Sequence, residues 1–508
     1  MLDHYLEPVI QNKIKLTSAL FMEGSISREA LSRILPIGTA GVNTLVDELK
    51  KELSGLAEIL RDPHTVSLSA DSKVHFFHLF RMICGNSSVL HCLRFLLCND
   101  GKRPFTQFVD EEYLTRSSAY RIRQNCQDYL RDIGLDLSEN RVVGEEHRIR
   151  FLMALLHYKY GIDCYEMEPK DIQAIRHFIL ETNRVIDHIY LEQTEHEYGY
   201  FEYLLFLAWK RQRYPVSPVV SEQLHTLKGL FPYDAIKKAL QKTLEPACSL
   251  TFSDSDYDYI YLAYCSTNNC LFADQWTDHD IEQIQAIILA APEFADLLNR
   301  FGKRFGLMVQ NSHALQTAIF YFCKKCLLEL QCIIPDKNFF TGLPDRPLNV
   351  ELRTMLAELL NQWREDNNIR YRIDSNHLIY LSIQFECILR QFMEPAKIVL
   401  LSDLTSELEA MELFLTRNFS PKRITVASFL LNAQLWEPLF DLRDCVIISH
   451  KKFEGVLTSM GLDRQNTLIL VTAEMHDSGI TALQNAIAAN ENTRFAQLLK
   501  ESYKRESR

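Results

Sequence analysis

Two segments near the N-terminus repeat the same order of helical signals, and this repeat constrains the fold more than composition does. In the first segment, residues 14–53, an apolar helix ends at Gly24, a second helix is capped by Ser27, and a third begins near Thr39. Residues 57–70 then alternate loosely between apolar and polar side chains, as paired strands do. This order predicts a helix-turn-helix followed by a wing.

The second segment, residues 89–134, has the same order. An apolar helix ends in a turn, a short helix covers 105–114, and Ser117 is expected to cap a third helix over 117–133. Residues 135–150 alternate around a turn and again predict paired strands. The buried stripe of the third helix is expected to be Ile122, Cys126, Tyr129, Leu130 and Ile133. The two segments together predict tandem winged helix-turn-helix domains.

The outer face of helix 117–133 carries side chains typical of a DNA-recognition helix. When Ile122 faces the core, helical geometry turns Tyr120 and Gln124 outward, and arginines flank that face. Arginine suits guanine edges and phosphates, glutamine suits adenine, and hydroxyls suit phosphate oxygens. The predicted DNA contacts are Arg116, Ser117, Ser118, Tyr120, Arg121, Arg123, Gln124 and Gln127. The alternative is an ordinary solvated surface helix.

The third helix of the first segment is less suited to DNA. It offers Thr39, Asn43 and Thr44 outward but no arginine. This helix is therefore either a secondary DNA contact or part of a helix-turn-helix with a structural role.

Charge is distributed unevenly along this chain of 508 residues with a net charge of −11. Residues 1–160 hold 20 Lys and Arg against 20 Asp and Glu, whereas the remainder holds 35 against 46. The whole acidic excess therefore lies beyond residue 160. A nucleic-acid site is expected in the N-terminal third.

The rest of the chain divides into a helical part and a part with strands. Residues 165–392 show long helical periods that divide near 246–280 and predict two all-α bundles. Beyond Pro395, short apolar runs rich in β-branched residues begin at residues 397, 424, 445 and 467. With helical patterns between them, these runs predict a small parallel α/β domain. The predicted class is a multidomain, mainly α protein with domains at 1–70, 71–164, 165–275, 276–394 and 395–508.

Several classes of protein are excluded by the sequence. No apolar run reaches the roughly 18–20 residues of a membrane helix, and no signal-peptide pattern opens the chain, so a cytoplasmic protein is expected. The thirteen cysteines are scattered within apolar patterns, and the pair spacing at 323–326 lacks a second metal-binding pair. No catalytic or phosphate-loop motif is present. We expect no enzyme activity, no metal and no cofactor.

The stretch "RSSAYRIRQNCQDYLRDIGLDLSENRVVGEEHRIRFLMALLHYKYG", residues 116–161, resembles the second helix-turn-helix of the Mga/AtxA class of Gram-positive virulence regulators. The order of the predicted domains is also similar to that class. The resemblance implies a cytoplasmic transcription regulator that binds double-stranded promoter DNA. It further implies two phosphotransferase-system regulatory domains (PRDs) and a C-terminal domain similar to sugar-transporter enzyme IIB. Such a protein is expected to form a homodimer or higher oligomer through the PRD-like and C-terminal domains.

The resemblance also implies control by a phosphotransferase-system phosphocarrier that modifies PRD histidines. The usual acceptor positions hold Leu204, Cys265 and Gln384, and the place of the enzyme IIB cysteine is taken by Ser402 and Asp403. The candidate phosphohistidines that remain are His188, His196, His225, His279 and His313.

Two other functions can be weighed against a DNA-binding regulator. A PRD-type antiterminator that binds RNA would begin with a small β-rich domain, whereas helical signals dominate residues 1–160. A phosphocarrier would need the cysteine that Ser402 and Asp403 replace.

Overall fold

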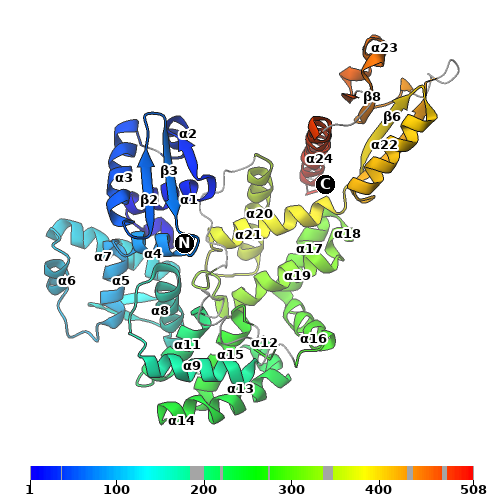
Figure 1. Cartoon of the computed structure of the whole chain (residues 1–508). Helices are drawn as coiled ribbons and strands as arrows, with labels where there is room; N and C mark the ends of the chain where they lie inside the picture. The colour runs from blue at the N-terminus through cyan, green and yellow to red at the C-terminus, as the bar shows by residue number, and fades with distance from the viewer. Residues whose placement is uncertain are drawn as a thin grey trace. The chain divides into compact units, whose positions relative to one another are not determined.

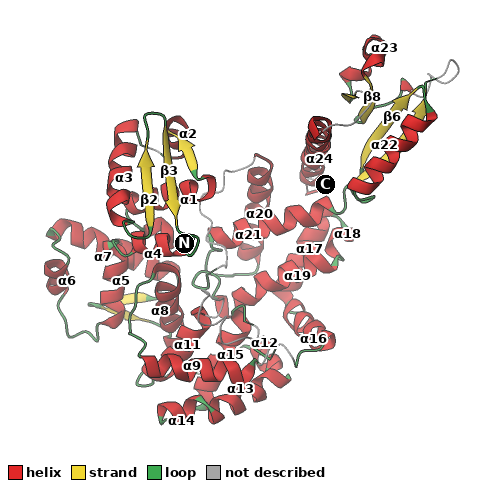
Figure 2. Cartoon of the chain, viewed as in Figure 1, coloured by secondary structure: helices red, strands yellow, loops and turns green. Residues whose placement is uncertain are grey.

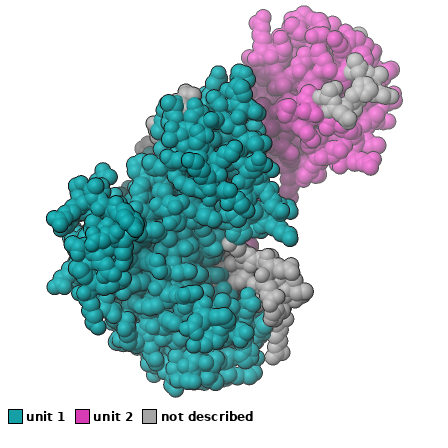
Figure 3. Space-filling view, turned by 60° about the vertical axis from the view of Figure 1, so that its left-hand side comes forward, with its two compact units in different colours: residues 1–298, 317–345, 355–381 teal, residues 299–316, 346–354, 382–508 magenta. Residues whose placement is uncertain are grey.

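The computed structural model describes residues 2–35, 37–183, 199–217, 221–269, 271–272, 275–335, 347–431, 439–471 and 477–506. Most of these residues are helical, and Figure 2 shows how few of them form strands. The chain forms two compact units, coloured separately in Figure 3. The first consists of residues 1–298, 317–345 and 355–381, and the second of residues 299–316, 346–354 and 382–508.

The helices and paired strands predicted for the first segment lie at the expected positions (Figure 1), together with a short 3-10 helix and a short strand that were not predicted. The elements are η1 (Leu2–Tyr5), α1 (Pro8–Glu23), β1 (Ser25–Ser27), α2 (Arg28–Ile34), α3 (Thr39–Glu52), β2 (Ala57–Arg61) and β3 (Thr65–Ala70). Gly24 caps the end of α1, and the Ser27 hydroxyl accepts a hydrogen bond from the Ala30 N–H at 3.2 Å. The strands form an antiparallel sheet in the order β1-β3-β2. Short β1 therefore pairs with β3 of the predicted wing.

The second segment follows the same plan with a smaller sheet. Its elements are α4 (Phe76–Cys84), α5 (Ser88–Cys98), α6 (Phe105–Glu111), α7 (Arg116–Asp132), β4 (Asp136–Ser138), β5 (Arg141–Val143) and α8 (Glu146–Tyr160). β4 and β5 form an antiparallel hairpin around Glu139 and Asn140. The predicted cap is wrong: Thr115, not Ser117, accepts the bond from the Ser118 N–H at 3.3 Å, so the helix begins at Arg116. Thr115, Ser117 and Ser118 all carry hydroxyl groups that can cap a helix, so the sequence alone did not indicate which of them is the cap.

Helices fill the middle of the chain, as predicted, and the described part of residues 165–392 contains no strand. The helices from 165 to 275 are α9 (Pro169–Thr182), α11 (Gly199–Lys210), α12 (Glu222–Leu227), α13 (Phe231–Lys242), α14 (Leu244–Cys248) and α15 (Asp254–Ser266). Those that follow are α16 (Asp278–Leu289), α17 (Pro292–Phe305), α18 (Leu307–Gln310), α19 (His313–Cys323), η2 (Lys324–Glu329), α20 (Pro347–Asp366) and α21 (Ser375–Arg390).

The C-terminal part confirms the predicted small parallel sheet. Its elements are β6 (Ala396–Ser402), α22 (Thr405–Asn418), β7 (Ile424–Leu430), β8 (Val446–His450), η4 (Lys451–Phe453), α23 (Glu454–Ser459), η5 (Leu462–Arg464), β9 (Thr467–Val471) and α24 (Asp477–Glu506). The strand order is β7-β6-β8-β9, with every neighbouring pair parallel. Alternate residues of the central strand β6 enter two separate hydrophobic clusters, Ile398 and Leu400 on one face and Val399 and Leu401 on the other. Burial on both faces explains why the strands are continuous apolar runs in the sequence.

Within the described part of the chain, none of the helices combines the length and the apolar character that a membrane crossing requires.

Candidate nucleic-acid interface

Helix α7 is held in place by the predicted buried stripe. Ile122, Cys126, Tyr129, Leu130 and Ile133 are all buried, as the helical period indicates. The Tyr129 ring packs against Tyr5 of η1 with 5.5 Å between centroids, and the Tyr5 hydroxyl donates to Asp132 at 2.7 Å. One face of α7 is therefore fixed from its middle to its last turn, which leaves the other face for a partner.

The C-terminal end of α7 is also tied to residues that lie far along the chain. The Arg148 guanidinium donates to the Ile133 carbonyl at 3.2 Å and to the Leu328 carbonyl at 2.7 Å. It also lies over the Tyr371 ring, with the guanidinium carbon 4.5 Å from the centroid. These contacts belong to the first compact unit and fix the helix relative to its scaffold.

The N-terminus of α7 is exposed and positively charged. Thr115, Arg116 and Ser117 are exposed, and the Thr115 hydroxyl donates to the Ser118 hydroxyl at 3.0 Å. A helix N-terminus presents unpaired backbone N–H groups and a partial positive charge, which suit a phosphate. This end of the helix can therefore contact a nucleic-acid backbone.

The outward face of α7 carries most of the predicted DNA contacts. Arg116, Ser117, Tyr120, Arg121 and Gln124 are exposed, whereas Ser118, Arg123 and Gln127 are half-buried. The Tyr120 side chain is 64% exposed, although its ring lies 6.3 Å from that of Phe105 on α6. Among the described residues, Arg116 and Arg121 have no hydrogen-bond or ion-pair partner. These two cations are therefore available to phosphates or bases.

Arg123 has a different environment. It donates a hydrogen bond to the backbone carbonyl of Glu139, in the turn between β4 and β5. Its guanidinium carbon also lies 5.6 Å from the Phe105 ring centroid. Arg123 thus joins α6, α7 and the hairpin, an arrangement that its sequence position did not indicate.

The two glutamines also have partners within the protein. Gln124 donates to Asp128 at 2.8 Å, and Gln127 donates to Asp136 at 3.3 Å. Hydrogen bonds from the Leu137 N–H and from Gln127, with the nearby Arg131, hold the pKa of the Asp136 carboxyl below its usual value. Asp136 therefore stays ionised and keeps Gln127 directed towards the hairpin.

Tyr113 is a candidate contact that the sequence analysis missed. It was expected inside the short helix 105–114, but α6 ends at Glu111 and Tyr113 lies in the turn before α7. Its backbone is left-handed with φ +51°, and its side chain is 96% exposed. A fully exposed aromatic ring beside the start of α7 is suited to stack on or insert against a nucleic acid.

Helix α3 presents a less favourable surface. Asn43 is half-buried and Thr44 is exposed, with its hydroxyl donating to the Ala40 carbonyl at 3.2 Å. The side chain of Thr39 lies outside the described residues. The exposed face also carries Asp47, which pairs with Arg61 of β2 at 2.9 Å. Its local charge is thus less favourable to phosphate than that of α7.

The candidate phosphohistidines are scattered. His225, His279 and His313 are exposed, and His279 lies 3.1 Å from the Gln283 amide nitrogen. His188 and His196 lie outside the described residues.

Two of the positions that the resemblance assigns to PRD phosphoacceptors hold Leu204, which is fully buried, and Cys265, whose thiol has its pKa raised by burial to about 12. A thiol with that pKa stays protonated and unreactive at neutral pH. Within the described residues, no three His, Cys, Asp or Glu side chains group closely enough to hold a metal ion.

The geometry around α7 is compatible with a DNA-binding helix-turn-helix domain, the class of domain found in transcription regulators. Residues 73–157, which run from just before α4 into α8, match the family model of the Mga helix-turn-helix domain. This match supports membership of the Mga-like regulator family and confirms the resemblance noted from residues 116–161. No curated protein matches the chain.

Proposed function

We propose that this regulator is of the Mga type and reads double-stranded promoter DNA chiefly with α7. The observation that carries the proposal is the exposed, unpaired pair Arg116 and Arg121 beside Tyr120, on a helix whose opposite face is buried. Arginine can pair with guanine edges in the major groove, and the helix N-terminus can position a phosphate. The residues proposed to contact DNA are Arg116, Ser117, Ser118, Tyr120, Arg121, Gln124 and Gln127, with Tyr113 added.

The two N-terminal segments would act as tandem winged helix-turn-helix domains. The β4–β5 hairpin follows α7 and carries the exposed Arg141, which suits a wing that contacts phosphates. The β2–β3 hairpin occupies the same place after α3. Because α3 lacks arginine and exposes Asp47, we assign its Asn43 and Thr44 a secondary contact.

Dimerisation through the PRD-like and C-terminal domains would bring two α7 helices to one operator. One helix reads only a few base pairs, and two half-sites add their binding free energies. The parallel order β7-β6-β8-β9 supports an enzyme IIB-like C-terminal domain. The place of the enzyme IIB cysteine is taken by Ser402, whose hydroxyl donates to Glu407 at 2.5 Å, so this domain would serve assembly.

Phosphorylation of a PRD-like domain would adjust that assembly. A phosphohistidine adds roughly −1.5 to −2 charges, enough to repack a helical contact. His225, His279 and His313 are exposed and can be reached by a phosphocarrier. Intact-mass measurement after incubation with the phosphotransferase relay tests this step. If the protein gains no phosphate, its control would depend on self-association or on another ligand.

The DNA-binding proposal is tested by a gel shift with a promoter fragment identified from a genome-wide map of bound DNA. We expect Arg121→Ala to weaken binding at least tenfold at near-physiological salt and to lower the salt slope by about one unit, the loss of one phosphate contact. The matched control is Arg417→Gln, an exposed arginine on α22 of the second unit, which should leave binding unchanged. Equal affinity of Arg121→Ala and the unmodified chain would refute the role of α7.

The rival RNA-binding function can be separated in the same assay. The described part of residues 2–160 consists mainly of helices, with only two small antiparallel sheets. We therefore expect the duplex DNA to be bound more tightly than an RNA transcript of the same sequence. The reverse preference would favour an antiterminator.

A further inference from the structure

A polar cavity of about 310 Å³ lies beside the β4–β5 hairpin, within the first compact unit. It is lined by the end of α5, by β5 and the residues after it, by the start of α8 and by the chain that follows α11. Its polar lining residues are Asn99, Asp100, Arg141, Glu146, Arg211 and Tyr214. The volume is many times that of one water molecule and lies in the range of small-molecule sites.

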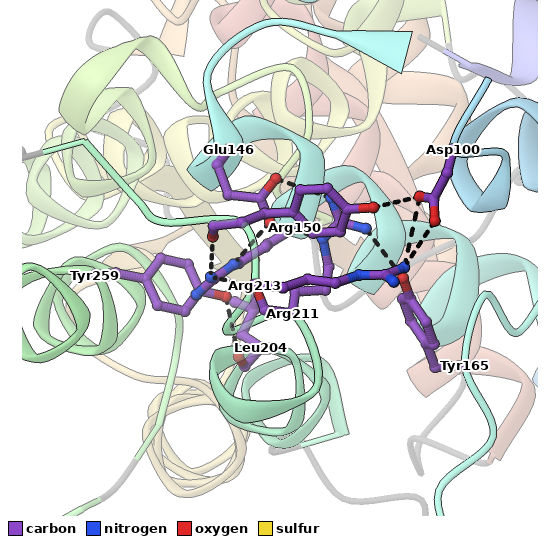
Figure 4. Close-up of polar contacts among 9 residues, drawn as sticks. Asp100, Glu146, Arg150, Tyr165, Leu204, Arg211, Arg213 and Tyr259 are labelled. Carbon is purple, nitrogen blue, oxygen red and sulfur yellow. Dashed lines mark hydrogen bonds and ion pairs between the residues drawn. The ribbon is translucent and has the colours of Figure 1, made fainter. Parts of the chain in front are cut away.

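Two guanidinium groups bind one carboxylate of the cavity lining, that of Glu146. Arg211 binds the Glu146 carboxylate with two hydrogen bonds, of 2.7 and 2.9 Å, and Arg150 donates to the same carboxylate at 3.0 Å (Figure 4). Arg150 is fully buried and Arg211 is 5% exposed, so two buried guanidinium groups share one carboxylate. An uncompensated buried charge is costly, and a bound anion would remove that cost.

Neutral groups satisfy only some of the hydrogen-bond donors of the Arg150 guanidinium. Arg150 also donates to the Arg211 and Tyr214 carbonyls at 3.3 and 3.0 Å, and its guanidinium carbon lies 4.7 Å from the Tyr259 ring centroid. Its Nη1 atom is buried and has no hydrogen-bond partner among the described residues. The group formed by Arg150, Glu146 and Arg211, which reaches the cavity through Glu146 and Arg211, therefore stays positively charged.

Asp100, which also lines the cavity, has the guanidinium groups of Arg213 and Arg141 near it. Asp100 accepts hydrogen bonds from the Tyr214 hydroxyl and, at 3.1 Å, from Arg213, and these contacts hold the pKa of its carboxyl below the usual value. The guanidinium carbons of Arg211, Arg213 and Arg141 lie 4.4, 4.9 and 5.8 Å from the Tyr214 ring centroid. Arg141 is exposed and has no hydrogen-bond or ion-pair partner among the described residues.

We propose that this cavity binds a small molecule bearing an oxyanion, a phosphate or a carboxylate, with Arg141 as its direct ligand. Arg141 and Arg211 line the site, and Arg150 and Arg213 donate to its two carboxylates, Glu146 and Asp100. The fork of Arg141 can bind an oxyanion with two hydrogen bonds. Arg211 already uses three of its five N–H donors on Glu146 and Tyr165, and it attracts the anion chiefly by charge. The Tyr214 ring offers a surface for the rest of the ligand.

Such a ligand would act on the DNA-binding surface through the hairpin. Arg141 begins β5 and follows the turn in which Glu139 accepts a bond from Arg123 of α7. An anion that draws Arg141 towards the cavity would therefore change the position of the hairpin relative to α7. This regulatory step rests on the proposed DNA-binding function, whereas ligand binding itself does not.

The test is calorimetric titration of the full chain with sodium phosphate and, separately, sodium citrate, at constant ionic strength set with sodium chloride. We expect saturable binding of at least one of the two anions with a millimolar or lower Kd. Arg141→Gln should weaken that binding at least tenfold, Arg141→Lys should weaken it less, and Arg417→Gln should leave it unchanged. A preference for phosphate or for citrate identifies which oxyanion the cavity accepts.

Two results would overturn the proposal. The first is that neither anion binds saturably below about 10 mM, a concentration that as a Kd corresponds to only about 2.7 kcal/mol of binding free energy. The second is that Arg141→Gln binds the anion as tightly as the unmodified chain. The melting temperature of each variant without ligand is measured in parallel, so that unfolding is not mistaken for loss of the site. Because the titration contains no DNA, a failure of DNA binding would contradict the proposed function and leave this result intact.

Discussion

Arg123 on α7 donates a hydrogen bond to the backbone carbonyl of Glu139, the first residue of the turn between β4 and β5. The contact spans 16 residues of sequence and fixes the hairpin to the helix proposed to read DNA. Arg121, two residues earlier, has no hydrogen-bond or ion-pair partner among the described residues. The two arginines on one helix thus have different environments, because Arg123 is held within the fold whereas Arg121 is free to contact a partner.

This division predicts different effects of the two alanine substitutions. Arg123→Ala should lower the free energy of unfolding by about 1–2 kcal/mol, because a charged hydrogen bond and a cation–π contact are lost. Arg121→Ala should leave stability within about 0.5 kcal/mol, since the side chain is exposed. Urea unfolding measures both. Equal destabilisation by the two variants would contradict the assignment, as would weaker DNA binding by Arg123→Ala at unchanged stability.

The Glu146 carboxylate is expected to stabilise the first unit strongly. Glu146→Gln keeps the shape of the side chain but removes the charge that faces Arg150 and Arg211. Breaking a buried pair by removing one partner typically costs about 3–5 kcal/mol. We expect a loss of that order in urea unfolding, and a change below about 1 kcal/mol for the exposed control Glu139→Gln. A small effect of Glu146→Gln would show that the two arginines find other compensation.

His147 should make stability depend on pH. Burial, with Arg148 and Arg150 nearby, lowers the pKa of its imidazole to about 4 against the partial opposition of Glu145. The unfolded chain binds this proton near pH 6.5 and the folded chain only near pH 4, so stability is kept above pH 6.5 and lost as pH falls. Between pH 7.5 and 5.5 the loss should be about 1 kcal/mol.

Urea unfolding of the full chain and of His147→Gln at both pH values isolates this contribution. The variant should lose less stability than the parent between pH 7.5 and 5.5, by about 1 kcal/mol. An identical pH dependence in both proteins would show that His147 is protonated in the folded state or solvated.

Gly134 should be intolerant of a side chain. Its φ is +78°, and an added Cβ would overlap the Tyr371 hydroxyl. Gly101 is the matched control, because its φ is +84° and no atom lies within 4 Å of the corresponding Cβ position. Gly134→Ala should therefore destabilise the chain by about 1–3 kcal/mol more than Gly101→Ala. Comparable unfolding free energies would mean that Tyr371 moves aside at little cost.

Periodicity in the sequence was sufficient to predict the buried stripe of α7 and the strands of the parallel sheet. The stripe from Ile122 to Ile133 and the parallel strands beyond Pro395 follow from spacing alone, because burial imposes a period on the apolar residues. The exposed Tyr120 and Arg121 were predicted by the same argument. These features depend on local geometry, which the chain encodes within a few residues.

Features that depend on contacts distant in sequence were not predicted. Arg123 has the sequence position of a DNA contact, and only the tertiary structure brings the Glu139 carbonyl to it. The cavity needs Asp100, Glu146 and Tyr214 to meet, and Tyr214 lies 114 residues beyond Asp100. The left-handed turn at Tyr113 was missed because helical spacing continues through it, although α6 has already ended.

The contact between Arg148 and Leu328 has a consequence for synthesis of the protein. The two residues are 180 positions apart, so the carbonyl that Arg148 needs does not exist when the helix-turn-helix leaves the ribosome. At translation rates of about 5–20 residues per second, the delay is roughly 10 to 35 s. Until then this end of α7 has its contacts with Tyr5 but lacks the support that comes through Arg148 from Leu328. A nascent chain would therefore acquire its complete helix-turn-helix domain only after most of the protein has been made.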